Sequence, residues 1–432
     1  MSEVSAPVAG WVCPFCALAC DHLDVQIGQD DEPLALRGGD CPRARSGLQT
    51  FASRSADVSP TIDGRNASLD DAVAAAARQL AASRQPLFAG LGTDVAGARA
   101  LYRLACACGA ICDGAGGDAA MHILRALQDR GQFTTTLAEV RTRADLIVFV
   151  GSLPTDLAPL LAQRCGIGEA QLATRHLVVL HPRAGDAAAL AAMARNGVSV
   201  ESIAPDGDLF TTLAQLNATL ARPASSAVPA QPSAAGAALH ALAERLRRAS
   251  YAVFIGAPLH LPAHGALIVE AVHRLIGRLN AGTRAAALWL DGGNGAATVN
   301  QVFAWLSGLP LRSRAGPRGL EHEPFAFGAA RLLEGAAVDL LMWVSSFDAA
   351  ALPPPCTQPL LALGHPAQAS ACARRDAVFI PVATPGIGVD GHVFRTDGTV
   401  LMPLRTVRPD ALPGVAEVAQ WLLRARRGLS QP

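Results

Sequence analysis

The chain has 432 residues, of which 50% are hydrophobic and only 17% are charged. Its 36 basic residues equal its 36 acidic residues, so nothing in the composition resembles a nucleic-acid-binding surface or an acidic tail, and a neutral, apolar chain favours protein partners. A chain of this length exceeds one ordinary hydrophobic core, so we expect two or three domains.

The sequence contains neither a signal-peptide pattern near its start nor a run of about 18 apolar residues that could cross a membrane. We therefore expect a cytoplasmic protein without a membrane segment. In a reducing cytosol clustered thiols more often bind metal, whereas scattered thiols pack as small hydrophobic groups. The scattered cysteines are expected to be packed in this way: Cys106, Cys108, Cys112, Cys165, Cys356 and Cys372.

The first residues form a loop-rich segment that contains four clustered cysteines. Cys13, Cys16 and Cys20 lie within CPFCALAC, and Cys41 follows after a Gly-rich turn. Four thiolates can complete a tetrahedral zinc site or a four-iron cluster. The CxxCxxxC spacing, the single distant cysteine and Pro42 after it favour iron, since structural zinc more often uses two CxxC pairs. Four unrelated buried cysteines are the alternative.

The sequence changes from a loop-rich to a helical pattern at residues 63–83, where Ser68 precedes Asp70 and Asp71 as in a capped helix. Short apolar runs that end in Gly, Ser or Pro then alternate with Ala-rich helical segments, which is typical of buried parallel strands. The sequence therefore predicts open α/β sheets, whose sites form at the carboxyl ends of the strands. The Pro/Ala/Ser-rich stretch 222–236 is expected to be a loop, and residues 414–428 a closing amphipathic helix. The predicted strands are 86–92, 144–152, 176–182, 251–259, 285–293, 338–346, 359–366 and 376–386.

An N-terminal CxxCxxxC module followed by such a body resembles the large subunits of molybdenum and tungsten bis-pterin oxidoreductases. Within that superfamily the chain is most similar to the B subunits of formylmethanofuran dehydrogenase and of the bacterial formyltransferase/hydrolase complex. The segments that carry the resemblance are CPFCALACDHLDV (13–25), ALQDRGQFTTTLAEVRTRADLIVFVGSLPTD (126–156), NGAATVNQVFAWLSGLP (294–310) and VFIPVATPGIGVDGHVFRTDGTVLMPLR (378–405).

The resemblance implies two doubly wound α/β domains, one of them discontinuous, after an iron–sulfur-type module. We expect the four-cysteine module at 1–58, the discontinuous domain at 59–130 and 331–432, and the inserted domain at 131–330. Cys13, Cys16, Cys20 and Cys41 are the expected metal ligands, with a [4Fe-4S] cluster favoured over zinc.

Two departures from the redox members of this family concern their chemistry. Those members place a metal-binding cysteine before the helix that corresponds to 116–129, but here Met121 precedes His122 and no cysteine occurs between 113 and 143. A thioether is a weak ligand compared with a thiolate, so Met121 is expected to be packed. Many relatives also have a lysine after the fourth cysteine, whereas this chain contains only arginine, such as Arg43 and Arg45.

A third feature is the loops that line pterin nucleotides in active relatives, which are retained here. Gly386, Gly388, Gly391 and Gly398 are expected to be kept because the fold needs their turns. Together with the departures this predicts that no tungsten or molybdenum pterin is bound, and we assign no catalytic residue.

The resemblance therefore implies a non-redox scaffold role, as the B subunit of the complex, in tetrahydromethanopterin-dependent one-carbon metabolism. Its expected partners are the other subunits of the complex, above all the zinc amidohydrolase subunit, and the complex handles a methanofuran-type formyl carrier. The first alternative is an active tungsten- or molybdenum-pterin dehydrogenase subunit. The second is a free-standing iron–sulfur protein, which lacks a second redox centre to receive its electron.

Overall fold

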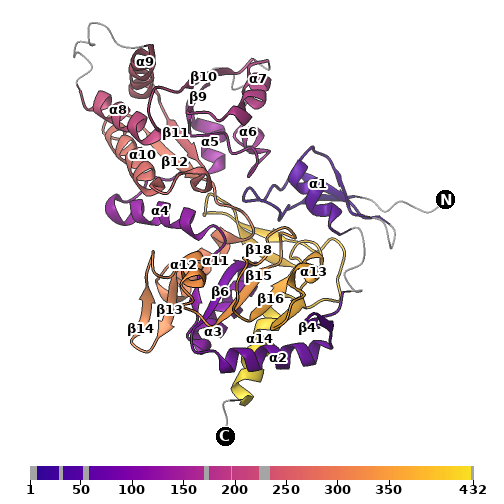
Figure 1. Ribbon diagram of the computed structural model, residues 1–432. Helices are drawn as coiled ribbons and strands as arrows, with labels where there is room; N and C mark the ends of the chain where they lie inside the picture. Colours follow the sequence, from indigo (N-terminus) through magenta and orange to yellow (C-terminus); the bar gives the residue numbers. More distant parts are fainter. Residues whose placement is uncertain are drawn as a thin grey trace, which may run out of the picture. The chain divides into compact units, whose positions relative to one another are not determined.

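A computed structural model describes residues 7–28, 33–51, 58–169, 175–195, 197–222 and 234–429 (Figure 1). The chain divides into two compact units: Met1–Gly117 with Gly292–Pro432, and Asp118–Asp291. The first unit is discontinuous and the second is inserted within it. Most of the predicted loop 222–236 lies outside the described residues, and a helix already begins at Ala234.

The first unit is built on a sheet whose centre is parallel. β6 (Pro86–Gly92), β15 (Leu340–Ser345), β16 (Leu360–Gly364) and β17 (Ala377–Pro381) pair in this order, and nearly every residue in them is buried. Burial on both faces explains why these strands are continuous apolar runs in the sequence. The remaining strands of this sheet are β7 (Ile111–Cys112), β13 (Ser313–Gly316), β14 (Gly319–His322), β4 (Thr61–Ile62) and β5 (Arg65–Asn66).

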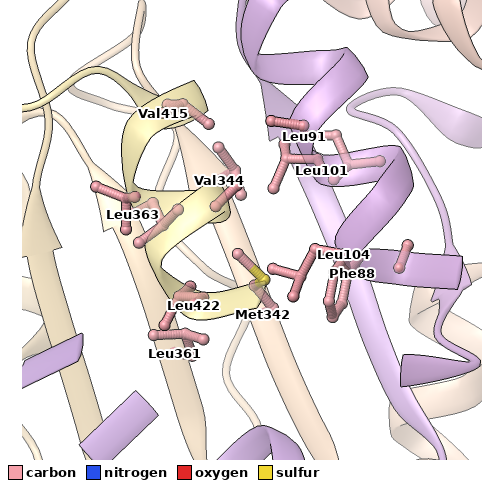
Figure 2. Packing of buried hydrophobic residues seen from close by; sticks show 14 of the residues in the cluster. Phe88, Leu91, Leu101, Leu104, Met342, Val344, Leu361, Leu363, Val415 and Leu422 are labelled. Carbon is pink, nitrogen blue, oxygen red and sulfur yellow. The ribbon is translucent and has the colours of Figure 1, made fainter. Parts of the chain in front are cut away.

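Helices cover both faces of this sheet. Phe88, Met342 and Leu361 of the strands pack against Leu104 and Leu422 of the helices in one buried cluster, shown in Figure 2. Each fully buried side chain of this kind contributes roughly 1.5–3 kcal/mol. The helices of the unit are α2 (Leu69–Ala82), α3 (Val95–Cys108), α11 (Ala296–Ser307), α12 (Ala329–Glu334), α13 (Ala369–Cys372) and α14 (Val415–Leu429).

Side-chain caps set where two of these helices begin. Ser68 accepts a hydrogen bond from the Asp71 N–H at the start of α2, as the sequence predicts. Asp94 accepts from the Gly97 N–H at 2.9 Å and starts α3 directly after β6. The cap of α3 thus places a carboxylate at the carboxyl edge of the sheet.

The second unit is a five-stranded parallel sheet in the order β10-β9-β8-β11-β12. Its core contains Val148, Phe254 and Leu275 from strands and helices. The strands are β8 (Leu146–Val150), β9 (His176–Leu180), β10 (Ser199–Ile203), β11 (Ala252–Gly256) and β12 (Ala285–Trp289). The helices are α4 (Gly117–Arg130), α5 (Leu137–Arg143), α6 (Leu161–Arg164), α7 (Ala187–Arg195), α8 (Leu209–Ala221), α9 (Ala234–Arg248) and α10 (Gly265–Leu279).

The cysteine-containing segment forms a small antiparallel sheet followed by one helix. The sheet has the order β1 (Val8–Trp11), β2 (Leu23–Gln26) and β3 (Ala35–Arg37), and the helix is α1 (Pro42–Gln49). This segment clusters with the first unit, as does the hairpin of β18 (Gly391–Phe394) and β19 (Leu401–Leu404).

The predicted α/β class, with one discontinuous and one inserted domain, is confirmed, but the limits of the units differ from those expected. α4 belongs to the second unit, where Arg130 pairs with Glu270 at 2.7 Å, so the insertion begins near 118 and not at 131. The stretch 292–330 belongs to the first unit, because α11 packs in its core and Ser313 of β13 pairs with Cys112 of β7. No helix in the described part of the chain is long and apolar enough to cross a membrane.

Candidate functional site

The four clustered cysteines lie in the first unit and all are buried. Cys13, Cys16, Cys20 and Cys41 expose between 2% and 7% of their surface. The Cys13 N–H donates to the Cys20 carbonyl at 2.9 Å and closes the loop that holds the first three thiols. Cys41 is the N-cap residue of α1, so Pro42 occupies the first helical position, where its missing N–H costs nothing.

The four thiols are close enough to influence one another. Burial raises the pKa of the Cys13 thiol well above its ordinary value, and negative charge on Cys16, Cys20 and Cys41 raises this pKa further. Their thiolate forms therefore disfavour one another unless a cation compensates them. In the described residues no group of three or more His, Cys, Asp and Glu side chains converges on a position for a single metal ion.

The cysteine loop is fixed to the loops that follow the sheet of the first unit. The Trp11 indole N–H donates to the Gly386 carbonyl at 2.9 Å, and the Thr396 N–H donates to the Ala17 carbonyl at 2.9 Å. A Cβ added to Gly293 would lie 3.5 Å from the Cα of Cys16. The cysteine loop therefore borders the segments 294–310 and 382–398, which resemble the pterin-lining loops of redox relatives.

The glycines of these segments are required by the turns themselves. Gly386 and Gly398 have φ angles of +84° and +68°, in the region that disfavours other residues. A Cβ on Gly388 would lie 2.7 Å from that of Asp410, and one on Gly391 would lie 2.8 Å from that of Pro385. The structure thus agrees with the expectation that the fold keeps these glycines.

Buried polar groups gather where the parallel strands of the first unit end. Ser346, after β15, donates to the Gly92 carbonyl at 2.8 Å, and Thr384, after β17, donates to the Ser346 carbonyl at 2.6 Å. His365, after β16, accepts from the Ala367 N–H at 3.1 Å, and burial lowers the pKa of its imidazole to about 4. At this edge, where α/β sheets usually bind ligands, each of these side chains bonds a backbone group of the protein.

At the same edge, two amide side chains occupy the space beside Gly92 and Gly364 that a Cβ atom would need. A Cβ on Gly92 would lie 2.5 Å from Oδ1 of Asn294, and one on Gly364 would lie 2.1 Å from Oε1 of Gln368. Within the described ranges both amide oxygens are buried without a hydrogen-bond partner, although the Nε2 of Gln368 donates to the Asp348 carbonyl at 3.0 Å. The sequence offered no signal for Gln368, because its position depends on the packing of β16.

Met121, within the stretch 116–129, is packed, and Asp113, just before that stretch, is paired. Met121 is 5% exposed within α4 of the second unit, as expected for a packed side chain. Asp113, just after β7, accepts from Arg312 Nε at 3.2 Å and from the Ala329 N–H at 2.8 Å. Both members of this ion pair are about 5% exposed, and the sequence separation of 199 residues hid it from sequence reasoning.

The carboxyl edge of the second sheet carries a Ser–His–Asp hydrogen-bond chain. Ser152, after β8, lies 3.1 Å from Nδ1 of His260, whose Nε2 lies 3.0 Å from Asp156. Ser152 is only 5% exposed, and the neighbouring Leu153 N–H already donates to Asp186 at 3.2 Å. A nucleophilic serine needs access and a donor for the developing oxyanion, so we interpret this chain as structural.

The scattered cysteines follow the expectation that they are packed. Cys112, Cys165 and Cys372 are buried, and Cys106, Cys108 and Cys356 are half-buried. All ten cysteines lie in the described part of the chain, and none of them forms a disulfide bond.

The chain matches no protein-family model. It is 33% identical over 367 residues to the B subunit of the formyltransferase/hydrolase complex of Methylorubrum extorquens, a match that spans 84% of this chain and 95% of that protein. It is 25% identical to the B subunit of tungsten-containing formylmethanofuran dehydrogenase 2 of Methanocaldococcus jannaschii, over 92% of this chain and 93% of that protein.

A solved structure agrees with these relatives. It is the formyltransferase/hydrolase complex of Methylorubrum extorquens with methylofuran, and one of its chains matches with a TM-score of 0.72 and 29% identity. The match covers 86% of this chain and all of that one.

Proposed function

The chain belongs to the family of B subunits of formyltransferase/hydrolase complexes, and we propose that it serves as the non-redox scaffold subunit of such a complex. The observation that carries this proposal is the match to the B subunit of the Methylorubrum complex over 95% of that protein. In this role the chain holds the hydrolase subunit of the complex, and the complex handles a methanofuran-type formyl carrier in the conversion of formaldehyde to formate.

The proposal that the subunit has no redox step of its own rests on its residues. No cysteine occurs between 113 and 143, where redox relatives hold their metal, and the buried Asp113–Arg312 pair lies at the start of that stretch. At the carboxyl edge of the first sheet, the hydroxyls of Ser346 and Thr384 already donate to backbone carbonyls of the protein. A pterin nucleotide would have to replace these internal bonds at a cost in free energy.

We also propose that the four cysteines hold a [4Fe-4S] cluster that stabilises the N-terminal segment. A zinc ion draws four sulfurs to within about 4 Å of one another, whereas a cluster binds each thiolate through a different iron. Cys13, Cys16, Cys20 and Cys41 are buried and close enough to influence one another, and their CxxCxxxC spacing with one distant cysteine followed by a proline favours the cluster. Its iron would offset the mutual repulsion of the thiolates. The cytoplasm, which keeps thiols reduced, is the compartment that fits ten cysteines without disulfides.

Co-expression tests the scaffold role. A tagged full-length chain is produced together with the transferase and hydrolase subunits from the same source, and the purified material is separated by size. The proposal predicts one complex that contains all subunits, and hydrolysis of the formyl carrier that requires this chain for full activity. Separate elution of the chain and of a fully active remainder would contradict it.

The alternative is an active dehydrogenase subunit. Its support is the 25% identity to the B subunit of the tungsten-containing enzyme. It predicts formate-dependent reduction of a viologen dye by the anaerobically purified complex. The scaffold proposal predicts none, and it predicts the same absence when the hydrolase subunit has been removed.

A further inference from the structure

A polar cavity of about 450 Å³ opens on the second unit, beside α10. It is lined by Arg130 from the end of α4, by Phe133, and by His273, Arg274 and Arg278 from α10. Its volume lies in the range of small-molecule sites, roughly 300–1,000 Å³. Nothing lies within 4 Å of the position that a Cβ on Gly277 would take, so the surface of α10 between Arg274 and Arg278 is open.

Positive charge dominates this cavity. Arg130 and Arg274 both pair with Oε1 of Glu270, at 2.7 and 2.8 Å, and these hydrogen bonds lower the pKa of the Glu270 carboxyl. Arg278 forms no ion pair within the described residues. Three guanidiniums therefore face one carboxylate, which leaves an excess of positive charge at the rim.

A buried hydrogen-bond donor adds to this charge. The indole N–H of Trp289 can only donate, so Nε2 of His273, 3.0 Å away, must accept, and the imidazole proton lies on Nδ1. Burial lowers the pKa of His273 to about 4, which keeps the ring neutral near pH 7. His273 is only 5% exposed, and its Nδ1 is buried without a hydrogen-bond partner among the residues that the structure describes. A buried donor without an acceptor is unfavourable, and an acceptor supplied by a ligand removes that cost.

We propose that this cavity binds a small ligand through an oxyanion, either a carboxylate or a phosphate. Arg274 and Arg278, one turn apart on α10, supply charge-assisted hydrogen bonds, and the Nδ1–H of His273 supplies a neutral one. Phe133, which is 55% exposed, offers its ring to a planar apolar body attached to the anion. This site lies within the second unit and does not depend on the scaffold role.

The test uses the full-length chain with three probes: benzoate, inorganic phosphate and phenyl phosphate. Binding is measured by calorimetry, and the Nδ1–H signal of His273 is followed in protein labelled with ¹⁵N-histidine. We expect saturable binding of at least one probe with a change in this signal, and preference for benzoate or phosphate distinguishes the two anion classes. The ring is needed if phenyl phosphate binds more tightly than phosphate. Absence of saturable binding by all three probes at millimolar concentrations would overturn the proposal.

Variants assign the binding to these residues. Replacing both rim arginines, Arg274→Gln with Arg278→Gln, should weaken binding by about tenfold or more, since charge-assisted bonds are lost. The control Arg195→Gln, on α7 near the opposite edge of the sheet, removes one exposed charge and should change affinity less than about twofold because salt screens it. His273→Phe should weaken binding with the charge unchanged. Equal affinity of the double variant and the original chain, at equal thermal stability, would refute the assignment.

Discussion

The buried ion pair of Asp113 and Arg312 offers a quantitative test of how the first unit is assembled. Asp113 follows β7, and its two carboxylate oxygens bond Arg312 Nε at 3.2 Å and the Ala329 N–H at 2.8 Å. Arg312 also donates to the Pro324 carbonyl. One carboxylate therefore ties β7 to the segments around β13 and α12, far along the chain.

We expect Asp113→Asn to reduce the free energy of unfolding of the first unit by about 3 kcal/mol. Removing one partner of a buried pair typically costs 3–5 kcal/mol, because the remaining charge stays buried. Asparagine keeps one acceptor oxygen, so its loss of stability should lie near the lower end of this range. Asp113→Ala removes both oxygens, and its loss should approach about 5 kcal/mol. Replacing both partners, Asp113→Ala with Arg312→Met, should recover part of the loss since no charge is left buried.

Native-state hydrogen exchange with peptide-level mass spectrometry is the suitable assay, because the two units need not unfold together. Peptides that contain β7 and β13 should lose protection in Asp113→Asn, and those of the second unit should not. The control is Asp40→Asn, which breaks the exposed pair with Arg45, whose side chains are 84% and 55% exposed. That exposed pair should contribute little to the free energy of unfolding, so Asp40→Asn should leave the protection nearly unchanged. A loss below about 1 kcal/mol for Asp113→Asn would refute the reasoning.

Three further predictions concern the first unit, and the first of them has a control in the second unit. Gly295→Ala should destabilise the first unit strongly and leave little folded protein in thermal melts, because Gly295 has φ +71° and the new Cβ would lie 2.4 Å from the Thr93 carbonyl oxygen. The control Gly277→Ala, in an open position inside α10, should instead stabilise the protein by about 0.5–1 kcal/mol. His365 has a folded pKa of about 4, below the unfolded value near 6.5, so the unfolded state binds its proton first. Stability should therefore be greatest above pH 6.5 and fall towards pH 4 in urea titrations, and His365→Asn should flatten that slope; an unchanged slope would speak against it. Cys13→Ser should lower the iron content of anaerobically purified protein and the melting temperature of the N-terminal segment, whereas Cys165→Ser should leave iron unchanged, and equal iron in both variants would refute the cluster.

Much of the fold could be predicted from the sequence, because its strands are buried on both faces and form short apolar runs. The run 86–92 coincides with β6, and the runs around β8, β11 and β16 contain those strands. The limits of the two units could not be predicted, since they depend on contacts such as the pairing of Ser313 with Cys112 across the insertion. Local periodicity carries no information about such pairs.

The four-cysteine site and the cavity beside His273 differ likewise in how far the sequence reveals them. The spacing of Cys13, Cys16, Cys20 and Cys41 marks them as a set in the sequence, and the structure places all four in one buried segment. His273 shows no such signal, because a single histidine in an amphipathic helix resembles any partly buried residue. Its position becomes informative only when the bond from Trp289, 16 residues away, fixes which ring nitrogen carries the proton.

The metal content of the anaerobically purified complex tests the central proposal most directly. Elemental analysis measures iron, zinc, tungsten and molybdenum together, relative to the amount of this subunit. The non-redox scaffold role predicts no stoichiometric tungsten or molybdenum, and the cluster proposal predicts about four iron atoms per chain. Stoichiometric tungsten or molybdenum, with formate-dependent dye reduction, would contradict the account.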